Sequence, residues 1–355
     1  MVCAPRSDSH TALDTLGVAL RAAPELSCPA GNLETLKAAV DAGADCVYVG
    51  LRNATNARNF PGLNFDERAL LQGVDYAHSM RCKVHLVLNT YPQASAPEPW
   101  HAALDRAALW EVDAVILADP GLMRRAAQRH PDLPVHLSVQ SGVTNAAAIN
   151  LYQRQFNIQR AMLPRMLSLQ QVRDVVQNIS VGVEVFAFGS LCVMVEGRCA
   201  LSSYVTGDSP HTTGACSPQK YARWQTSPDG EESRLNGWLI DRSEAGGDTG
   251  YPVLCKGRFD AGDTHNYHAF DAPERINALE MLPQWISMGV RAVRIEGRQR
   301  SPAYVEQVTR IWRQAIDQCM EQAPPRPPQP AWIAALEAID RDHPRDRDVH
   351  RISWS

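Results

Sequence analysis

The sequence predicts an α/β protein, a (β/α)8 barrel of the TIM type, and three observations lead to this prediction. Short apolar segments rich in β-branched residues alternate with longer amphipathic segments from Pro24 to Ser190. The apolar segments lack strict polar alternation, as expected of strands that are covered on both faces. A further strand–helix unit, Ala292–Glu296 followed by Pro302–Cys319, completes the eight strands that a barrel needs. An open, doubly wound sheet is the alternative architecture.

The first half of the chain supplies most of these units. Its expected strands are Glu25–Ser27, Cys46–Leu51, Lys83–Asn89, Ala114–Asp119, Val135–Val139, Ala161–Leu163 and Val183–Phe188. Its expected helices are Asn32–Ala42, Asp66–Met80, Pro99–Trp110, Gly121–His130, Asn145–Phe156 and Ser168–Asn178. Asn32 suits a helix N-cap, and Gly43 suits the end of the same helix. Repeated units of this size indicate a parallel sheet.

The repeat is interrupted between about residues 190 and 285, where the chain is rich in Gly, Ser, Thr, Asp and His. We expect an irregular insertion there, before the last strand of a barrel domain that covers residues 24–322. An insertion of this length is usually functional or disordered. Residues 1–23 are interpreted as an N-terminal extension. Residues 323–355 begin with a proline-rich connector and continue through a short helix, Trp332–Ile339, into a charged tail.

Composition excludes several classes of protein. Lys and Arg number 35 and Asp and Glu 39, so the formal net charge is −4. An acidic balance argues against a broad nucleic-acid-binding surface, so no stable binding of nucleic acid is expected. No apolar run is long enough for a transmembrane segment. The first 23 residues make a poor secretory signal, so a cytoplasmic protein is expected.

Four of the nine cysteines lie in or beside the insertion, namely Cys192, Cys199, Cys216 and Cys255, in the spacing C-x6-C-x16-C-x38-C. Cys192 and Cys199 are two helical turns apart, so a helix would present both thiols on one face. Four thiolates suit an iron–sulfur cluster or a structural zinc ion. The lack of a tight C-x2–4-C pair favours the cluster over zinc. Four unrelated buried thiols are the third interpretation.

Residues after the predicted strands are candidates for a binding site, because the active face of a barrel lies at the carboxyl ends of its strands. Arg58, Arg165 and Arg298 are suited to bind a small dianion through forked guanidinium contacts. Gln140 and Glu296 occupy equivalent positions after other strands. A structural ring of ion pairs at the barrel mouth is the alternative.

Two histidines lie inside predicted strands. His85 and His136 are interpreted as core residues whose hydrogen bonds are satisfied, rather than as metal ligands.

Three segments carry a resemblance to a known family. The segments EVFAFGSLCVMVEGRCALSSY (Glu184–Tyr204), GDSPHTTGACSPQKYARW (Gly207–Trp224) and YPVLCKGRF (Tyr251–Phe259) resemble the collagenase-like peptidase family U32, and most closely its ubiquinone-biosynthesis members. The early ELSCPAGNLETLKAAVDAGADCVYVGL and the late RIEGRQRSPAYV (Arg294–Val305) resemble the wider family. The resemblance extends from about Pro24 to Cys319.

The resemblance implies a function. Similar members carry a 4Fe-4S cluster on four cysteines, which match Cys192, Cys199, Cys216 and Cys255 here. It further implies an oxygen-independent hydroxylase of a ubiquinone precursor, working under anaerobic conditions as a heterodimer with UbiV and assisted by a lipid-binding accessory protein. Related members hydroxylate bases of transfer or ribosomal RNA, and prephenate is implied as an oxygen donor.

Proteolysis is not expected despite the family's name. The sequence contains neither H-E-x-x-H nor G-x-S-x-G, so the common zinc-protease helix and the serine nucleophile elbow are absent from it. Cys28 and Cys46 stand beside predicted strand ends and are interpreted as core thiols rather than nucleophiles.

Overall fold

The computed structural model describes residues 22–59, 62–190, 192, 194, 198–243, 249–270, 275–321 and 325–342. Most of residues 1–23, and the tail beyond residue 342, lie outside the described residues. The barrel strands are β1 (Glu25–Pro29), β2 (Cys46–Gly50), β3 (Lys83–Leu88), β4 (Ala114–Leu117), β5 (Val135–Leu137), β6 (Arg160–Met162), β7 (Gly182–Ser190) and β14 (Ala292–Ile295).

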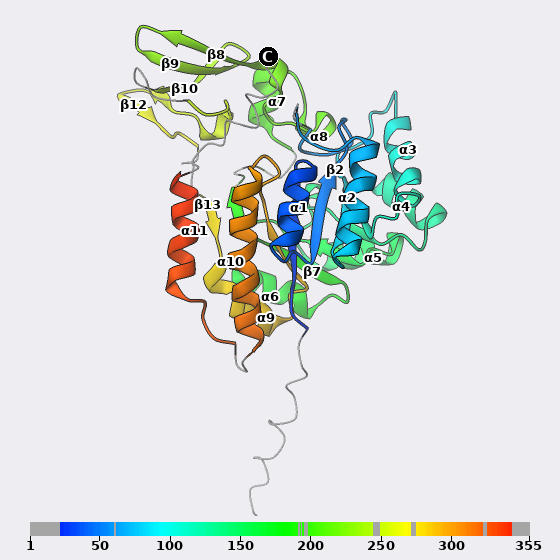
Figure 1. The fold of residues 1–355 in the computed structure, drawn as a ribbon. Helices are drawn as coiled ribbons and strands as arrows, with labels where there is room; N and C mark the ends of the chain where they lie inside the picture. Colours follow the sequence, from blue (N-terminus) through cyan, green and yellow to red (C-terminus); the bar gives the residue numbers. More distant parts are fainter. Residues whose placement is uncertain are drawn as a thin grey trace, which may run out of the picture.

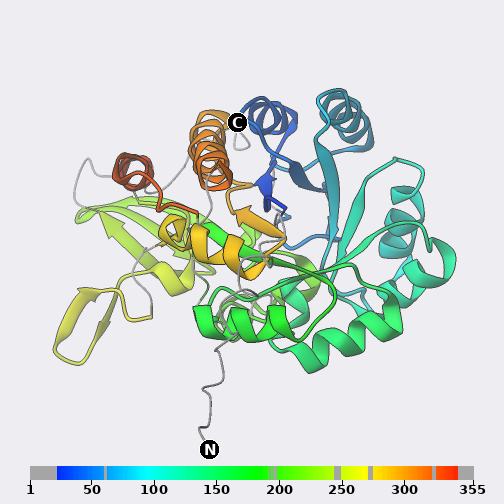
Figure 2. The same ribbon diagram turned by 90° about the horizontal axis from the view of Figure 1, so that it is seen from below.

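The predicted barrel is confirmed within the described residues. Its eight strands are all parallel and follow the order β7-β14-β1-β2-β3-β4-β5-β6, and β6 pairs with β7 to close the ring. Figure 2 shows the helices arranged around the outside of this ring. The open doubly wound alternative is wrong, because a closed sheet has no edge strands in the ring.

Helices connect most of the strands and cover the outer face of the barrel. They are α1 (Leu33–Asp41), α2 (Glu67–Ser79), α3 (Glu98–Ala107), α4 (Pro120–Arg129), α5 (Ala146–Phe156), α6 (Leu169–Gln177) and α10 (Pro302–Met320). Asn32 caps α1 as predicted, its side chain accepting a hydrogen bond of 2.8 Å from the backbone N–H of Thr35. The main apolar core lies between these helices and the strands.

The insertion lies between β7 and β14; its part from α7 to β12 lies over the end of the barrel where the strands finish, whereas its last helix lies beside α6 and α10 (Figure 1). It contains two short helices, two small antiparallel sheets and one more helix before β14. These are α7 (Ala200–Thr206), α8 (Pro210–Thr213), β8 (Ala222–Ser227), β9 (Gly230–Leu235), β10 (Trp238–Ser243), β11 (Phe259–Ala261), β12 (Thr264–Tyr267) and α9 (Leu282–Met288). Strand β13 (Arg275–Asn277) leaves the insertion and pairs antiparallel with the upper end of β7.

The insertion is therefore more regular than its composition predicts. Strands β8, β9 and β10 form a three-stranded meander. Its turns carry the dipeptides Asp229-Gly230 and Asn236-Gly237, which are strong short-range hairpin signals. Asn236 and Gly237 both have positive φ, at 48° and 84°, as a tight hairpin turn requires. These two dipeptides are the sequence signal for the sheet.

After the barrel, the chain passes through the proline-rich segment and forms α11 (Pro330–Asp342), which covers the predicted Trp332–Ile339 helix. Helix α11 contacts α10 and β13 on the side of the barrel. Among the described residues, none of the helices combines the length and the apolar character that crossing a bilayer requires.

The interior of the barrel is layered. An apolar layer near the carboxyl ends of the strands consists of Tyr48, Val87, Ile116, Val139, Met162 and Phe186. Charged side chains occupy the interior closer to the amino ends, where Arg160 and Arg294 both pair with Glu184. Of these charged side chains, Arg294 also reaches the space at the carboxyl ends of the strands, beside Tyr48 of the apolar layer.

Candidate active site at the barrel mouth

The carboxyl ends of the barrel strands enclose a small pocket of about 60 Å³. The structure brings together in its lining all five side chains that the sequence singles out, namely Arg58, Gln140, Arg165, Glu296 and Arg298. They come from segments spread over more than 200 residues of sequence, and closure of the barrel places them around one opening. The apolar layer forms the rest of the wall.

Glu296 is the central carboxylate of this pocket. It accepts a hydrogen bond of 2.8 Å from Nη2 of Arg58 and one of 2.9 Å from the backbone N–H of Ser190, and it lies 3.5 Å from Nη2 of Arg165. Burial alone would raise the pKa of the Glu296 carboxyl, but the two guanidinium groups and the Ser190 N–H lower it to about 2. Glu296 is therefore ionised. For Arg58 and Arg165, the alternative interpretation as structural ion-pair partners at the barrel mouth applies.

Arg298 is placed differently. It is 5% exposed and donates hydrogen bonds to two amide oxygens, Oδ1 of Asn56 at 2.9 Å and Oδ1 of Asn64 at 3.3 Å. Within the described ranges no carboxylate lies within ion-pair distance of it. Burial, together with the positive charges of Arg58 and Arg294, lowers the pKa of Arg298. An anion in the pocket would stabilise this buried charge, as the dianion prediction requires.

The floor of the pocket contains a charged residue that sequence reasoning missed. The guanidinium of Arg294 lies 3.4 Å from the ring centroid of Tyr48, and its Nη1 donates a hydrogen bond of 2.7 Å to Glu184. The Tyr48 hydroxyl donates to the carbonyl oxygen of Ile295 at 2.8 Å. Arg294 occurs in an otherwise apolar strand segment, Ala-Val-Arg-Ile, and that interruption is the signal that could have identified it.

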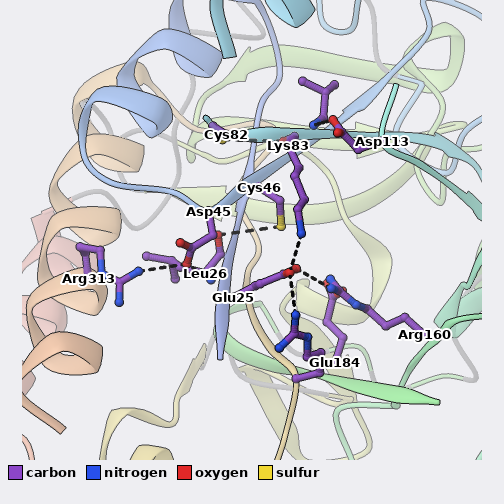
Figure 3. Close-up of polar contacts among 12 residues, drawn as sticks. Glu25, Leu26, Asp45, Cys46, Cys82, Lys83, Asp113, Arg160, Glu184 and Arg313 are labelled. Atoms are coloured by element: carbon purple, nitrogen blue, oxygen red, sulfur yellow. Dashed lines mark hydrogen bonds and ion pairs between the residues drawn. The ribbon is translucent and has the colours of Figure 1, made fainter. Parts of the chain in front are cut away.

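Below the floor, a network of ion pairs occupies the amino-terminal end of the barrel (Figure 3). Arg160 donates to Glu184 at 3.2 Å and also bonds to Glu25, which accepts from Lys83 at 2.8 Å. Burial opposes the charge of Glu184, yet Arg294 and Arg160 lower the pKa of its carboxyl to about 2. The network fixes Arg294 from below, because one carboxylate binds both guanidinium groups.

The two strand histidines lie beside this network. Their rings meet edge to face with centroids 4.8 Å apart. Burial lowers the pKa of His85 to about 4, and burial followed by the His85 charge lowers that of His136. Both are core residues as predicted, but the expectation of satisfied hydrogen bonds is wrong for one atom of each, because in the described residues Nδ1 of neither ring has a partner. In the described part of the barrel interior, neither nitrogen has a hydrogen-bond donor or acceptor within reach.

The four cysteines of the insertion lie near one another. Burial, together with the nearby thiols of Cys216, Cys192 and Cys199, raises the pKa of the Cys255 thiol to about 12. Burial and Cys199 raise the pKa of Cys216, and burial and Cys192 raise that of Cys199. Direct contacts agree with this: Ser202 on α7 bonds to the Cys199 sulfur and to the Cys216 carbonyl oxygen, and α7 contacts the turn Leu254–Lys256 that carries Cys255. The fold thus brings into one region cysteines that are up to 63 positions apart in the sequence.

This group of thiols lies next to the pocket. Burial opposes the charge of Arg58, but Glu296 and the thiols of Cys216 and Cys192 favour it and raise its pKa. The cysteine segment approaches the barrel loops closely at Gly214, whose φ is +87°, since a Cβ there would lie 2.3 Å from the carbonyl oxygen of Asn56. A glycine at that position lets the segment rest on the mouth.

One detail of the cysteine prediction is wrong. Cys192 and Cys199 do not share a helix face, because α7 begins at Ala200 and Cys199 is its N-cap. The backbone N–H of Ser202 donates to the Cys199 sulfur at 3.4 Å, so the cysteine takes the place of a capping side chain. Among the described residues, no three His, Cys, Asp or Glu side chains are grouped tightly enough to hold a single metal ion.

Comparison with known proteins identifies the family. A family model described as Peptidase family U32 matches residues 31–346. The chain belongs to peptidase family U32. An uncharacterized protease of Methanocaldococcus jannaschii is 32% identical over 302 residues, which are 84% of this chain and 66% of the relative. The tRNA hydroxylation protein P of Helicobacter pylori (strain ATCC 700392 / 26695) is 32% identical over 297 residues, 82% of this chain and 64% of the relative.

This U32 chain thus spans about two thirds of the length of the curated relatives that it matches. A solved U32 peptidase structure is similar to it with a TM-score of 0.42 and 18% identity, over 47% of this chain and 70% of that one.

The two remaining cysteine candidates of the U32 chain are inert. Cys28 and Cys46 are fully buried in the barrel wall, and burial raises the pKa of both thiols, that of Cys46 to about 12. A thiol must ionise to act as a nucleophile, and these do not at neutral pH. Their placement agrees with the interpretation as core thiols.

Proposed function

We propose that this U32 chain is the iron–sulfur subunit of an oxygen-independent hydroxylase. The observation that carries the proposal is the gathering of four thiols beside Arg58, at the mouth of a barrel whose pocket holds Glu296 and Arg298. Active sites of such barrels lie at this end. The hydroxylation named for the Helicobacter pylori relative supports the same class of reaction.

The residues present fit a 4Fe-4S cluster. Four cysteine thiolates are the usual ligand set of such a cluster, and Cys192, Cys199, Cys216 and Cys255 supply it. Each ligand of a cube binds a different iron, so the thiols need not crowd together as they would around one ion. The cluster would supply single-electron transfer beside the pocket. Zinc on the same thiols is the alternative, and it would make the chain a non-catalytic scaffold.

The chain's own side chains would bind and orient an anionic oxygen donor, for which prephenate is our candidate. Arg298 offers a buried positive charge held by two asparagines, and Gln140 lies in the same lining. Glu296 fixes Arg58 and Arg165, so these guanidinium groups are held in position before a ligand arrives. The apolar layer would contact the uncharged part of such a ligand and limit the approach of water.

For the molecule that is hydroxylated we propose a ubiquinone precursor. The support is the resemblance of the segments around Cys192, Cys216 and Cys255 to UbiU, which also suggests a heterodimer with UbiV and help from a lipid-binding accessory protein under anaerobic conditions. An RNA base is the second candidate, favoured by the relative named tRNA hydroxylation protein P.

The first experiment tests the cluster. Anaerobically purified protein should contain about four irons per chain and show the absorbance and paramagnetic resonance of a 4Fe-4S cluster. Replacing any of the four cysteines with Ala should remove that signal. Cys82→Ala is the matched control, because Cys82 is buried in the barrel, away from the insertion, and the signal should persist. A colourless protein with one zinc per chain would refute the proposal.

The second experiment separates the two substrates. A strain that lacks this chain is grown without oxygen, and its quinones and its modified RNA bases are measured. Loss of ubiquinone with accumulation of an incompletely hydroxylated precursor supports the first candidate. Normal ubiquinone with a missing hydroxylated base supports the RNA candidate. Co-purification from anaerobic cells tests the UbiV partnership.

A further inference from the structure

One loop of the barrel mouth contacts both the cysteine segment and the residues that hold Arg298. This loop connects β2 to α2. Gly214 of the cysteine segment lies against the backbone carbonyl of Asn56 on the loop. Ala215, the next residue of the segment, packs with Leu63 of the loop in a small buried apolar cluster. The cysteine segment therefore contacts the β2–α2 loop at two separate points.

Asn56 also contacts the arginines of the pocket. Its side chain is fully buried, and its Oδ1 accepts hydrogen bonds from Nη2 of Arg298 at 2.9 Å and from the backbone N–H of Arg58 at 3.1 Å. Its Nδ2 donates to the carbonyl oxygen of Leu51 at 2.6 Å. Both polar atoms of this carboxamide are therefore bonded, and one residue orients the guanidinium of Arg298 while its own carbonyl faces the cysteine segment.

The packing around Asn56 leaves little room for independent movement. A Cβ at Gly50 would clash with Nη1 of Arg298 and would lie 2.7 Å from Oδ1 of Asn56. On the barrel side of the loop, Oδ1 of Asn89 accepts a hydrogen bond of 2.9 Å from the backbone N–H of Ala57. A shift of the Asn56 backbone therefore changes the angle of its bond to Arg298, and hydrogen bonds weaken steeply as their angle departs from linear.

We propose that Asn56 is a positioning residue that couples the anion affinity of Arg298 to the contact between the cysteine segment and the β2–α2 loop. Gly214 fixes the Asn56 carbonyl, and the Asn56 side chain fixes the guanidinium that receives the anion. The inference rests on the proposed function and adds a regulation to it, because the donor is held tightly only when the segment that carries Cys216 lies in place. By linkage, a bound anion stabilises the placement of that segment by the same factor.

The test measures the binding of inorganic phosphate to the full chain without iron, by titration calorimetry. Phosphate is a small anion that probes the pocket without assuming a particular donor, and the absence of iron makes the result independent of the cluster. Arg298→Gln should abolish the binding, which assigns the measured heat to the pocket. A wild type that binds no phosphate, or an Arg298→Gln variant that binds it equally well, would overturn the inference at its first step.

Two glycine variants test the contact between segment and loop. Gly214 and Gly207 both follow short helices of the insertion with positive φ, and neither lines the pocket. Gly214→Ala displaces the Asn56 carbonyl and should weaken phosphate binding about tenfold, as the loss of a hydrogen bond to a charged group does. Gly207→Ala should bind phosphate as the wild type does, because a Cβ there meets nothing within 4 Å. Equal affinity of Gly214→Ala and wild type contradicts the coupling.

A double-mutant cycle shows whether the effect passes through Asn56. Asn56→Ala removes the bond to Arg298 and should by itself weaken phosphate binding about tenfold. Adding Gly214→Ala to this variant should cause little further loss, because residues of one hydrogen-bonded network act non-additively. A further tenfold loss in the double variant would overturn the role of Asn56. If Asn56→Ala does not fold, Asn56→Ser serves instead.

A second variant on the same loop controls for a general loosening of the loop. The side chain of Asn53 accepts hydrogen bonds from the backbone N–H and the hydroxyl of Thr55, at 3.0 Å and 2.7 Å. Asn53→Ala removes these bonds within the loop, and it should leave the affinity for phosphate unchanged. A loss as large as that of Asn56→Ala would mean that any disturbance of the loop weakens the pocket, which contradicts a specific role for Asn56.

The two proposals fail in different ways. A chain that binds no iron but shows the non-additive cycle would keep the coupling through Asn56 and remove the proposed function. A chain with about four irons whose Asn56 and Gly214 variants act additively would keep the cluster and remove Asn56 from the regulation of the pocket.

Discussion

At the scale of single residues, Arg298 is the most informative side chain of the mouth. Its charge is buried against two amide oxygens, whereas Arg58 and Arg165 are paired with Glu296. A guanidinium held in this way retains hydrogen-bonding capacity for an anion, and forked contacts depend on its planar shape. Arg298 is thus the residue whose substitution best distinguishes a role in anion binding from a role in structural ion pairing.

We expect Arg298→Lys to weaken the binding of prephenate by about 10- to 100-fold, the range for losing a hydrogen bond to a charged group. Titration calorimetry at constant ionic strength measures the dissociation constant. Arg52→Lys is the control, because Arg52 is an exposed mouth-side residue with only long contacts, to Asp66 at 3.8 Å and to the Asn64 carbonyl oxygen at 3.4 Å. Equal affinity of wild type and Arg298→Lys would show that this arginine is structural.

His85 makes stability depend on pH. In the unfolded chain the imidazole takes up a proton below about pH 6.5, but in the barrel its pKa is about 4. The unfolded state thus binds more protons in this window, and stability falls as the pH drops from 6.5 towards 4. Between pH 7.5 and 5.5 the loss from this group is about 1 kcal/mol. Glu184, with its pKa near 2, remains ionised throughout that range.

Urea unfolding at pH 7.5 and 5.5 measures this effect. His85→Gln should reduce the difference in unfolding free energy between the two pH values by about 1 kcal/mol relative to wild type. His101→Gln, on α3 outside the barrel, should leave the difference unchanged. An unchanged difference in His85→Gln would mean that the imidazole is already protonated in the folded barrel at pH 5.5.

At the scale of elements, the position of the cysteine segment depends on close contact with the barrel loops. Gly214 and Gly207 both end short helices with positive φ, at +87° and +74°. A Cβ at Gly214 meets the Asn56 carbonyl at 2.3 Å, whereas one at Gly207 meets nothing within 4 Å. Substituting either glycine with Ala therefore adds similar backbone strain, about 1 kcal/mol, and only the substitution at Gly214 adds a steric clash.

We expect Gly214→Ala to move the segment that carries Cys216 and to lower the iron content after anaerobic reconstitution by more than half. Gly207→Ala should load iron as the wild type does, although its positive φ costs it about 1 kcal/mol of stability. Iron per chain and the cluster absorbance are the measurements. Full loading of Gly214→Ala would show that the thiols can gather without this contact.

Some helices and strands can be predicted from local sequence alone, and others cannot. The barrel strands and the caps of α1, α2, α4, α5 and α6 follow from apolar segments and from Asn, Asp or Ser before each helix. The meander β8–β10 was missed because its strands are mostly polar, although its Asp-Gly and Asn-Gly turns were readable. Strand β13 was missed because three residues carry no periodicity.

At the scale of the whole molecule, the charge balance bears on the choice between the two substrates. An excess of four acidic residues gives no general attraction for a polyanion. We expect the purified chain to show no saturable binding of bulk transfer RNA at about 150 mM salt in a filter-binding assay, since non-specific affinity comes from neutralised phosphates. Tight binding that weakens steeply with salt would instead favour the RNA candidate.

The sequence by itself determined the strand–helix repeat and the residue types of the mouth, because each depends on local periodicity or on position at a strand end. It favoured a closed barrel over an open sheet, but the pairing of β6 with β7 that closes the ring is a tertiary contact. The set of four cysteines could be chosen from spacing and resemblance, without knowledge of how the chain folds between them. Arg58, Gln140, Arg165, Glu296 and Arg298 were likewise selected as strand-end residues, and all of them line one pocket.

Only the tertiary structure decided which arginine pairs with a carboxylate, that Arg294 is fixed by Glu184, and that β7 changes its pairing partner from β6 to β13. The physical reason is sequence separation. Arg160 meets Glu25 across 135 positions and Arg58 meets Glu296 across 238, and no local pattern encodes such pairs. Burial then shifts the pKa values of these groups, because the energy of an ion depends on every group that surrounds it.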